Sequence, residues 1–193
     1  PPEPPQEPII TPQIIADTRF ADDIELANEY ITTRNFDSAE KIYKSIYTAE
    51  PKHLKNLLAY ANLCFMQKRN TEAADLYNQA LEINPNIVKA LFNLGTICFY
   101  NRKYESAVNY LAKALQLYPK ILGAYLILAQ IYQIAGKYGE SIKLLSHAVT
   151  LSPRNPVIYL KLSALHIQLR QYDEAVKVLK RAVEISPADV ESR

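Results

Sequence analysis

The sequence predicts an all-α protein built as a right-handed α-solenoid of five stacked helix-turn-helix repeats. The segment from Val88 to Pro119 carries apolar residues at three- and four-residue spacing, interrupted at residues 101–104. This pattern indicates two amphipathic helices joined by a tight turn. Prolines and small side chains then recur along the chain at a constant interval of 34 residues. An interval of this length indicates one helical hairpin that stacks on copies of itself.

Three sets of residues carry this interval. The prolines follow each second helix and end it, because proline has no backbone N–H with which to continue a helix. The small residues stand where two helices must approach closely. The prolines are Pro51, Pro85, Pro119, Pro153 and Pro187, one set of small residues is Ala39, Ala73, Ala107, Ser141 and Ala175, and the other is Ala27, Ala61, Gly95, Ala129 and Ser163.

These residues resemble the tetratricopeptide repeat, which has small residues at positions eight, twenty and twenty-seven. Counted from Phe20, the chain matches that pattern almost throughout, and Ile46 at position twenty-seven of the first repeat is a departure. Position seventeen is aromatic in four repeats and Asn70 in the second. The resemblance covers nearly all of the chain after residue 19, and repeats of this kind serve many partners. The repeats are 20–53, 54–87, 88–121, 122–155 and 156–189, and the aromatics are Phe36, Tyr104, Tyr138 and Tyr172.

Composition agrees with a helical repeat protein. Of the 193 residues 49% are hydrophobic and only four are glycine, which fits helices joined by short turns without a single central core. The net charge of +2 does not indicate a nucleic-acid partner. No apolar run is long enough to span a bilayer, and there is no secretory signal. The missing initiator Met predicts a fragment or a processed chain, for which cytoplasmic and periplasmic locations are both open.

The two ends of the chain do not follow the repeat. Residues 1–8, PPEPPQEP, predict an extended Pro-rich linker, either a semi-rigid spacer or a proline-motif ligand through which the chain self-associates. Residues 9–19 predict an N-terminal cap, because Thr11 followed by Pro12 is typical of a helix start. Residues 190–193 predict the truncated continuation of another first helix. The apolar residues expected to hold the cap are Ile9, Ile10, Ile14 and Ile15, packed near Ile24 and Tyr30.

Two helix starts have recognisable capping residues. Asp37 with Glu40 resembles a capping box at the second helix of the first repeat. Asn155 followed by Pro156 predicts a side-chain cap and a first-turn proline for the first helix of the fifth repeat.

By resemblance, the first helix of each repeat lines an inner, concave groove, which is the candidate binding site. Its apolar side chains and amides suit a peptide, because the side chains form pockets while the amides pair with the peptide backbone. The alternative is that the family pattern places these residues for packing between repeats. The candidate groove residues are Ile24, Asn28, Leu58, Asn62, Phe65, Phe92, Asn93, Thr96, Phe99, Tyr100, Leu126, Gln130 and Leu160.

The carboxylate clamp that chaperone-binding members of the family carry is not expected here. The clamp needs a set of lysines, asparagines and an arginine in three successive repeats, and no starting repeat supplies the full cationic set. In the frame that starts at the second repeat, for example, the cations are replaced by Leu58, Gly123 and Ile127.

Cations recur in the turn between the two helices of each repeat and predict a basic edge. Cations are also expected at helix C-termini because they offset the helix dipole, and acidic residues at the starts of the second helices neutralise much of the row. An anionic partner on this edge remains an alternative. The cations are Arg34, Lys68, Arg69, Arg102, Lys103, Lys137 and Arg170, and the acidic residues are Asp37, Glu72, Glu105, Glu140 and Asp173.

No residue pattern predicts catalysis, a cofactor or a metal site. His53, His147 and His166 are not spaced with another ligand as metal sites require, and the chain has no phosphate-binding loop or nucleophile motif. Cys64 and Cys98 stand one repeat apart, about 8–10 Å by helix packing, which exceeds the reach of a disulfide. We therefore expect both cysteines to be reduced.

The function predicted from these observations is a non-catalytic scaffold that binds a partner peptide or helix in its concave groove. The alternative is a targeting or regulatory arm of a larger enzyme or of a cell-envelope assembly complex.

Overall fold

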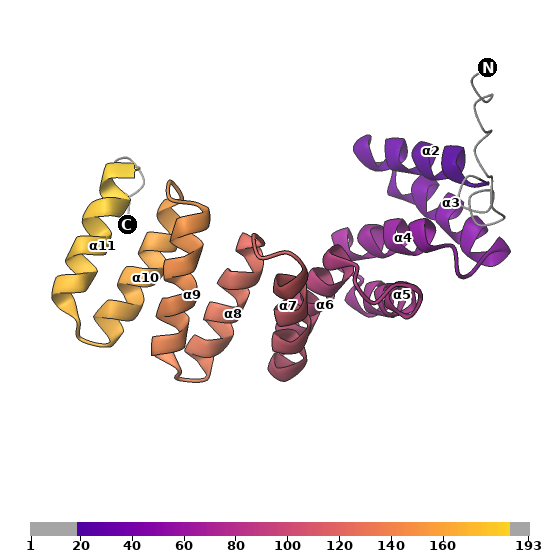
Figure 1. The fold of residues 1–193 in the computed structure, drawn as a ribbon. Coiled ribbons are helices and arrows are strands. Elements are labelled where there is room, and N and C mark those ends of the chain that lie inside the picture. Colours follow the sequence, from indigo (N-terminus) through magenta and orange to yellow (C-terminus); the bar gives the residue numbers. More distant parts are fainter. Residues whose placement is uncertain (1–18, 186–193) are drawn as a thin grey trace, which may run out of the picture. The chain divides into compact units, whose positions relative to one another are not determined.

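The computed structural model describes residues 19–185, which form ten α-helices and no strand (Figure 1). The expected all-α repeat class is therefore confirmed. The Pro-rich linker, the cap segment up to residue 18 and the continuation at 190–193 lie outside the described residues.

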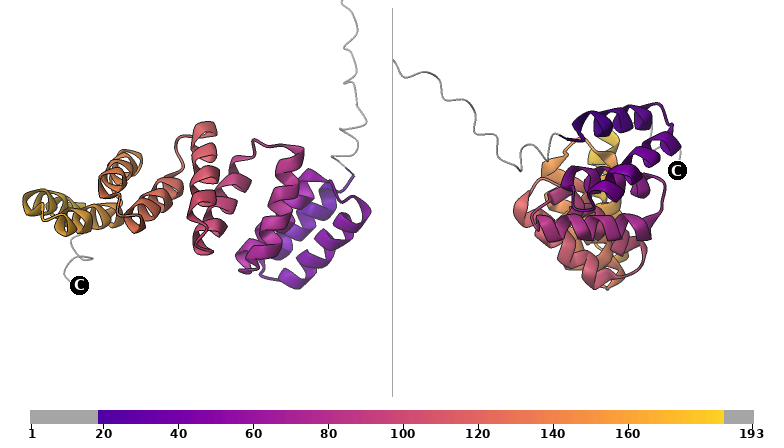
Figure 2. Two further views of the ribbon diagram at one scale, coloured as in Figure 1. Left: turned by 90° about the horizontal axis from the view of Figure 1, so that it is seen from below. Right: turned by 90° about the vertical axis from the view of Figure 1, so that its right-hand side faces the viewer.

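The helices fall into two compact units, residues 1–90 and 91–193, and α6 (Val88–Tyr100) spans the boundary between them. Successive helices pack on one another within each unit. Figures 1 and 2 show the paired helices α8 with α9 and α10 with α11 lying side by side. The first unit contains α2 (Ala21–Thr32), α3 (Phe36–Ala49), α4 (Leu54–Met66) and α5 (Asn70–Ile83), and the second contains α7 (Tyr104–Leu117), α8 (Leu122–Ile134), α9 (Tyr138–Leu151), α10 (Pro156–Gln168) and α11 (Tyr172–Ile185).

Small residues allow the two helices of a hairpin to approach closely, as the sequence predicts. A Cβ atom on Gly95 would lie 2.6 Å from Cγ of Leu111 and 3.4 Å from the carbonyl oxygen of Ala107. In the fourth repeat Ser141 stands at the position that Ala107 has in the third. Its hydroxyl donates a hydrogen bond of 2.8 Å to the carbonyl oxygen of Ala129. The buried hydroxyl is therefore satisfied. The predicted small residues Ala39, Ala73, Ala107, Ser141 and Ala175 are all buried.

One expected helix cap is confirmed and one is wrong. Asn155 caps α10, since its side chain accepts a hydrogen bond from the N–H of Val157. The cap of α3 is Asn35, whose side chain accepts from the N–H of Ser38. Asp37 lies inside the first turn instead, where a carboxylate favours the positive end of the helix dipole.

Glu40 does not complete that capping box. Its two carboxylate oxygens accept from Nη1 of Arg69 at 2.8 and 2.9 Å, and Lys44 lies 2.8 Å away. Tyr60 donates to the same carboxylate at 3.4 Å, and Nη2 of Arg69 donates to Sγ of Cys64 at 2.9 Å. This cluster joins α3, α4 and the N-terminal end of α5, so it connects the first two repeats.

Charge in this cluster changes the pKa of Glu40. Partial burial raises the pKa of the carboxyl, but the hydrogen bonds from Lys44 and Arg69 outweigh that effect and lower it below 4.5. The ionised carboxylate therefore stabilises the folded state.

Replacing Gly95 by Ala should destabilise the second unit, because the added methyl group would overlap the Leu111 side chain. Overpacking of this kind costs about 1–3 kcal/mol. Gly139, inside α9, has no atom within 4 Å of the corresponding position. Gly139→Ala should therefore cost no stability, because the position is open and Ala is the better helix former. Thermal melting checks both variants, and equal melting temperatures would show that α6 and α7 do not approach as described.

Glu40→Gln should lower the free energy of unfolding at pH 7 by about 1.5–3 kcal/mol, because hydrogen bonds to a charged group are lost. The folded-state pKa is lowered, so the contribution of the carboxylate is present above pH 4.5 and is lost as the pH falls through the folded value. Urea titrations of the wild type and the variant should therefore converge as the pH falls through the folded-state pKa of Glu40, which lies below 4.5. Glu82→Gln on the exposed side of α5 is the control. A stability difference that persists unchanged into acid would contradict the role of the charge.

Candidate partner-binding site

The candidate residues of the first unit lie on α2 and α4, and two of them form a repeated polar contact. The hydroxyl of Tyr43 donates to Oδ1 of Asn28 at 2.8 Å, and the hydroxyl of Tyr77 donates to Oδ1 of Asn62 at 2.7 Å. Both tyrosines are fully buried, and burial raises the pKa of Tyr43 to about 12. A buried hydroxyl needs an acceptor, so these amide oxygens have a structural role.

This contact could have been read from the sequence. Asn at position nine accompanies Tyr at position twenty-four in the first two repeats. In later repeats position twenty-four is Leu, as in Leu111 and Leu145, and position nine is Thr96, Gln130 or Ala164. The remaining candidates of the first unit, Ile24, Leu58 and Phe65, are half-buried.

In the second unit Phe92, Asn93 and Thr96 mainly pack inside the protein. The ring of Phe92 lies against Gly123, where an added Cβ would be 2.9 Å from the ring. Asn93 and Thr96 are only 7% and 8% exposed, and the Thr96 hydroxyl donates to the carbonyl oxygen of Phe92 at 2.9 Å. These three residues can therefore offer a partner only a small area.

Tyr100, in contrast to these three residues, is largely open to solvent. It is 67% exposed, more than any other large hydrophobic side chain among the described residues. Its ring centroid lies 5.6 Å from that of Phe99, which is half-buried and packs 6.2 Å from the ring of Tyr104. The ring of Phe99 thus lies between those of Tyr100 and Tyr104, and Tyr100 presents an exposed aromatic surface at the C-terminal end of α6.

Leu126 and Gln130 line one small cavity between α8, α9 and α10. Gln133 and Lys161, which are not among the candidate groove residues, line it as well. Its volume is about 10 Å³, which holds no more than one water molecule. A partner would therefore contact these residues at the surface. Leu160 is half-buried on α10 and does not line this cavity.

The turn cations differ from expectation in two ways. Arg69 is paired with Glu40 across helices, so it is not part of an open basic edge. Of the acidic residues expected to neutralise the row, Glu72 lies 3.7 Å from Nε of Arg69, whereas Glu140 pairs along its own helix with Lys143. Four turn cations have positive φ, and in the fourth repeat a glycine takes this position. They are Arg34, Lys68, Arg102 and Arg170, and the glycine is Gly136.

His53 lies in the loop between two repeats and caps α4. It is buried, its Nδ1 accepts from the N–H of Asn56 at 3.1 Å, and its ring meets Phe20 edge-on. Cys64 and Cys98 are both free thiols. Residues 19–185 contain no group of three or more His, Cys, Asp or Glu side chains arranged to hold a metal ion.

Comparison with known proteins identifies the family. A family model described as the middle TPR-like domain of cilia and flagella-associated protein 70 matches residues 24–147. The chain belongs to this family. A second model, described as a tetratricopeptide repeat, matches residues 133–192. Comparison with curated protein sequences gives no match.

Solved structures show the same tetratricopeptide-repeat fold at low sequence identity. A crystal structure of MamA is 21% identical with a TM-score of 0.79, and the match covers 86% of this chain and 96% of that one. YrrB, described as a TPR protein with an unusual peptide-binding site, is 17% identical with a TM-score of 0.74, covering 86% of each chain. PilF from Pseudomonas aeruginosa is 20% identical with a TM-score of 0.74, covering 89% of this chain and 78% of that one.

The family fold is generally a non-enzymatic module for protein–protein interaction. Among the helices that the structure describes, none has the length and apolar character needed to cross a membrane.

Proposed function

We propose that this chain is a non-catalytic scaffold that binds a peptide or helix of a partner protein on the exposed side chains of its first helices. The observation that carries the proposal is the exposure of apolar residues at one repeat position. Within the second unit Tyr100 is 67% exposed, and the residue at the same position of the following repeat, Ile134, is 53% exposed. Exposed apolar side chains that recur in this way favour a protein partner.

Two further candidate residues on α8 and one structural relative support this site. Gln130 is exposed beside half-buried Leu126, so an amide stands next to an apolar surface, as peptide recognition requires. YrrB, which has the same fold, is described as having a peptide-binding site. The net charge of +2 and the incomplete carboxylate clamp disfavour a nucleic acid and a chaperone C-terminus as ligands.

The family match also indicates the kind of cellular structure to which the partner belongs. It covers residues 24–147 with a domain that is described as part of a cilia and flagella-associated protein. This favours a ciliary or flagellar partner over the cell-envelope or enzyme assemblies that the sequence leaves open.

Tyr100→Ala combined with Ile134→Ala should reduce partner binding about tenfold or more, because an exposed aromatic that becomes buried in an interface contributes about 1.5–3 kcal/mol. The measurement is quantitative capture of partner proteins from a ciliated cell extract on immobilised wild-type and variant chains, followed by affinity measurement with the recovered partner. Both side chains are exposed, so melting should not change.

Lys113→Ala on the exposed side of α7 is the matched control. If it reduces binding while the double variant binds normally, the site lies on the second helices. A loss of binding with salt that the double variant does not alter would instead favour the turn cations.

A further inference from the structure

The first helices of the second unit carry one cation and no carboxylate. Lys161 of α10 is the only Lys, Arg, Asp or Glu on α8, on α10 and on residues 91–100 of α6. The acidic residues in the described part of this unit all lie on second helices. They are Glu105, Glu140, Asp173, Glu174 and Glu184.

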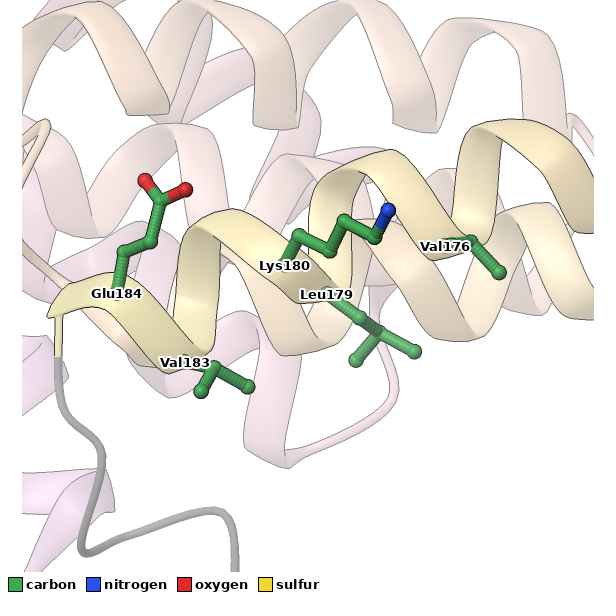
Figure 3. A pocket seen from close by; sticks show the side chains of 5 residues that line it. All are labelled: Val176, Leu179, Lys180, Val183 and Glu184. Atoms are coloured by element: carbon green, nitrogen blue, oxygen red, sulfur yellow. The ribbon is translucent and has the colours of Figure 1, made fainter.

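Cations on the second helices have acidic neighbours, whereas Lys161 has none. On α11, Nη1 of Arg181 lies 2.7 Å from a carboxylate oxygen of Glu184. Figure 3 shows Glu184 on that helix, with Lys180 one turn before it. Among the described residues no carboxylate lies within ion-pair distance of Lys161. This exposed ammonium group is therefore free to pair with a charge that a partner supplies.

The side chain of Lys161 lies beside the polar and apolar groups of the first-helix site. Lys161, Gln130 and Gln133 line one small cavity together with Leu126. Gln130 and Gln133 are exposed, and Ile134 follows Gln130 at i+4. Residues at this spacing are neighbours on the surface of a helix. An apolar side chain, two amides and a cation are therefore neighbours on α8 and α10.

This combination of groups fits an acidic segment of a partner protein. An apolar side chain of the segment packs on Ile134, the amides of Gln130 and Gln133 pair with its backbone, and a carboxylate pairs with Lys161. A basic segment would bring like charges together, with no carboxylate on these helices to compensate. A nucleic acid is also a poor ligand, because its phosphate backbone is held by several cations.

We propose that the segment bound at the first-helix site carries an Asp or Glu whose side chain pairs with Lys161. This inference rests on the proposed function, since it names the chemistry of the segment that the same site binds. It differs from the carboxylate clamp, in which several cations hold a terminal carboxylate. Here one lysine meets a side-chain carboxylate within the segment.

Peptide selection from a phage-displayed library of short random sequences tests the proposal, with the full 193-residue chain as bait. The peptides are fused to the phage through their C-termini, so any carboxylate that the bait selects belongs to a side chain. The wild-type chain should enrich Asp and Glu over the input library. The Lys161→Glu chain should instead deplete them and enrich Lys and Arg, because the charge at this position is reversed.

Fluorescence anisotropy with the peptide most enriched on the wild type measures the effect. Lys161→Glu should weaken its binding at least about fivefold, because repulsion replaces attraction. Changing the acidic residue of the peptide to Lys should weaken binding to the wild type and restore binding to the Lys161→Glu chain. A lysine that acted only on folding would not give this recovery. Lys161 is exposed, so melting should not change.

Lys113→Glu is the matched control, because Lys113 is exposed on the second helix α7. It should alter neither the selected sequences nor their affinity. Tyr100→Ala combined with Ile134→Ala should weaken binding of the selected peptides. If only this double variant fails to do so, the first-helix site is contradicted while the pairing with Lys161 stands.

Two outcomes would overturn the pairing. One is a wild-type selection without enrichment of Asp or Glu, and the other is peptide affinity that Lys161→Glu leaves unchanged. In either case a loss of binding in the Tyr100→Ala, Ile134→Ala chain would still support the proposed function. A wild-type chain that enriches no peptide would contradict both proposals.

Discussion

Packing between the second helix of one hairpin and the first helix of the next is the interaction on which this fold depends. Leu111 and Leu145 are buried because Leu128 and Leu162 of the following repeats lie in the same clusters. Burying one such side chain contributes about 1.5–3 kcal/mol, whereas ordering each residue costs about 1–2 kcal/mol of backbone entropy. A lone hairpin cannot meet that cost, so each repeat is stable only with its neighbours.

The two compact units carry the same repeat with different side-chain chemistry. In the first unit, polar contacts join the helices, as in Tyr43 with Asn28 and Arg69 with Glu40. In the second unit leucine takes the position of the tyrosine, so no hydroxyl at this position needs an acceptor from the first helix. The exposed aromatic surface of Tyr100 belongs to this more apolar unit.

The helices and the close contact at Gly95 could be predicted from the sequence, because a steric requirement that recurs every 34 residues leaves a visible pattern. The pairing of Glu40 with Arg69 could not, since it joins side chains 29 residues apart and both had plausible local roles. The candidate groove residues were predicted only from their positions within the repeat. Whether a residue there is open, like Tyr100, or buried, like Asn93, depends on the size of its neighbours on adjacent helices.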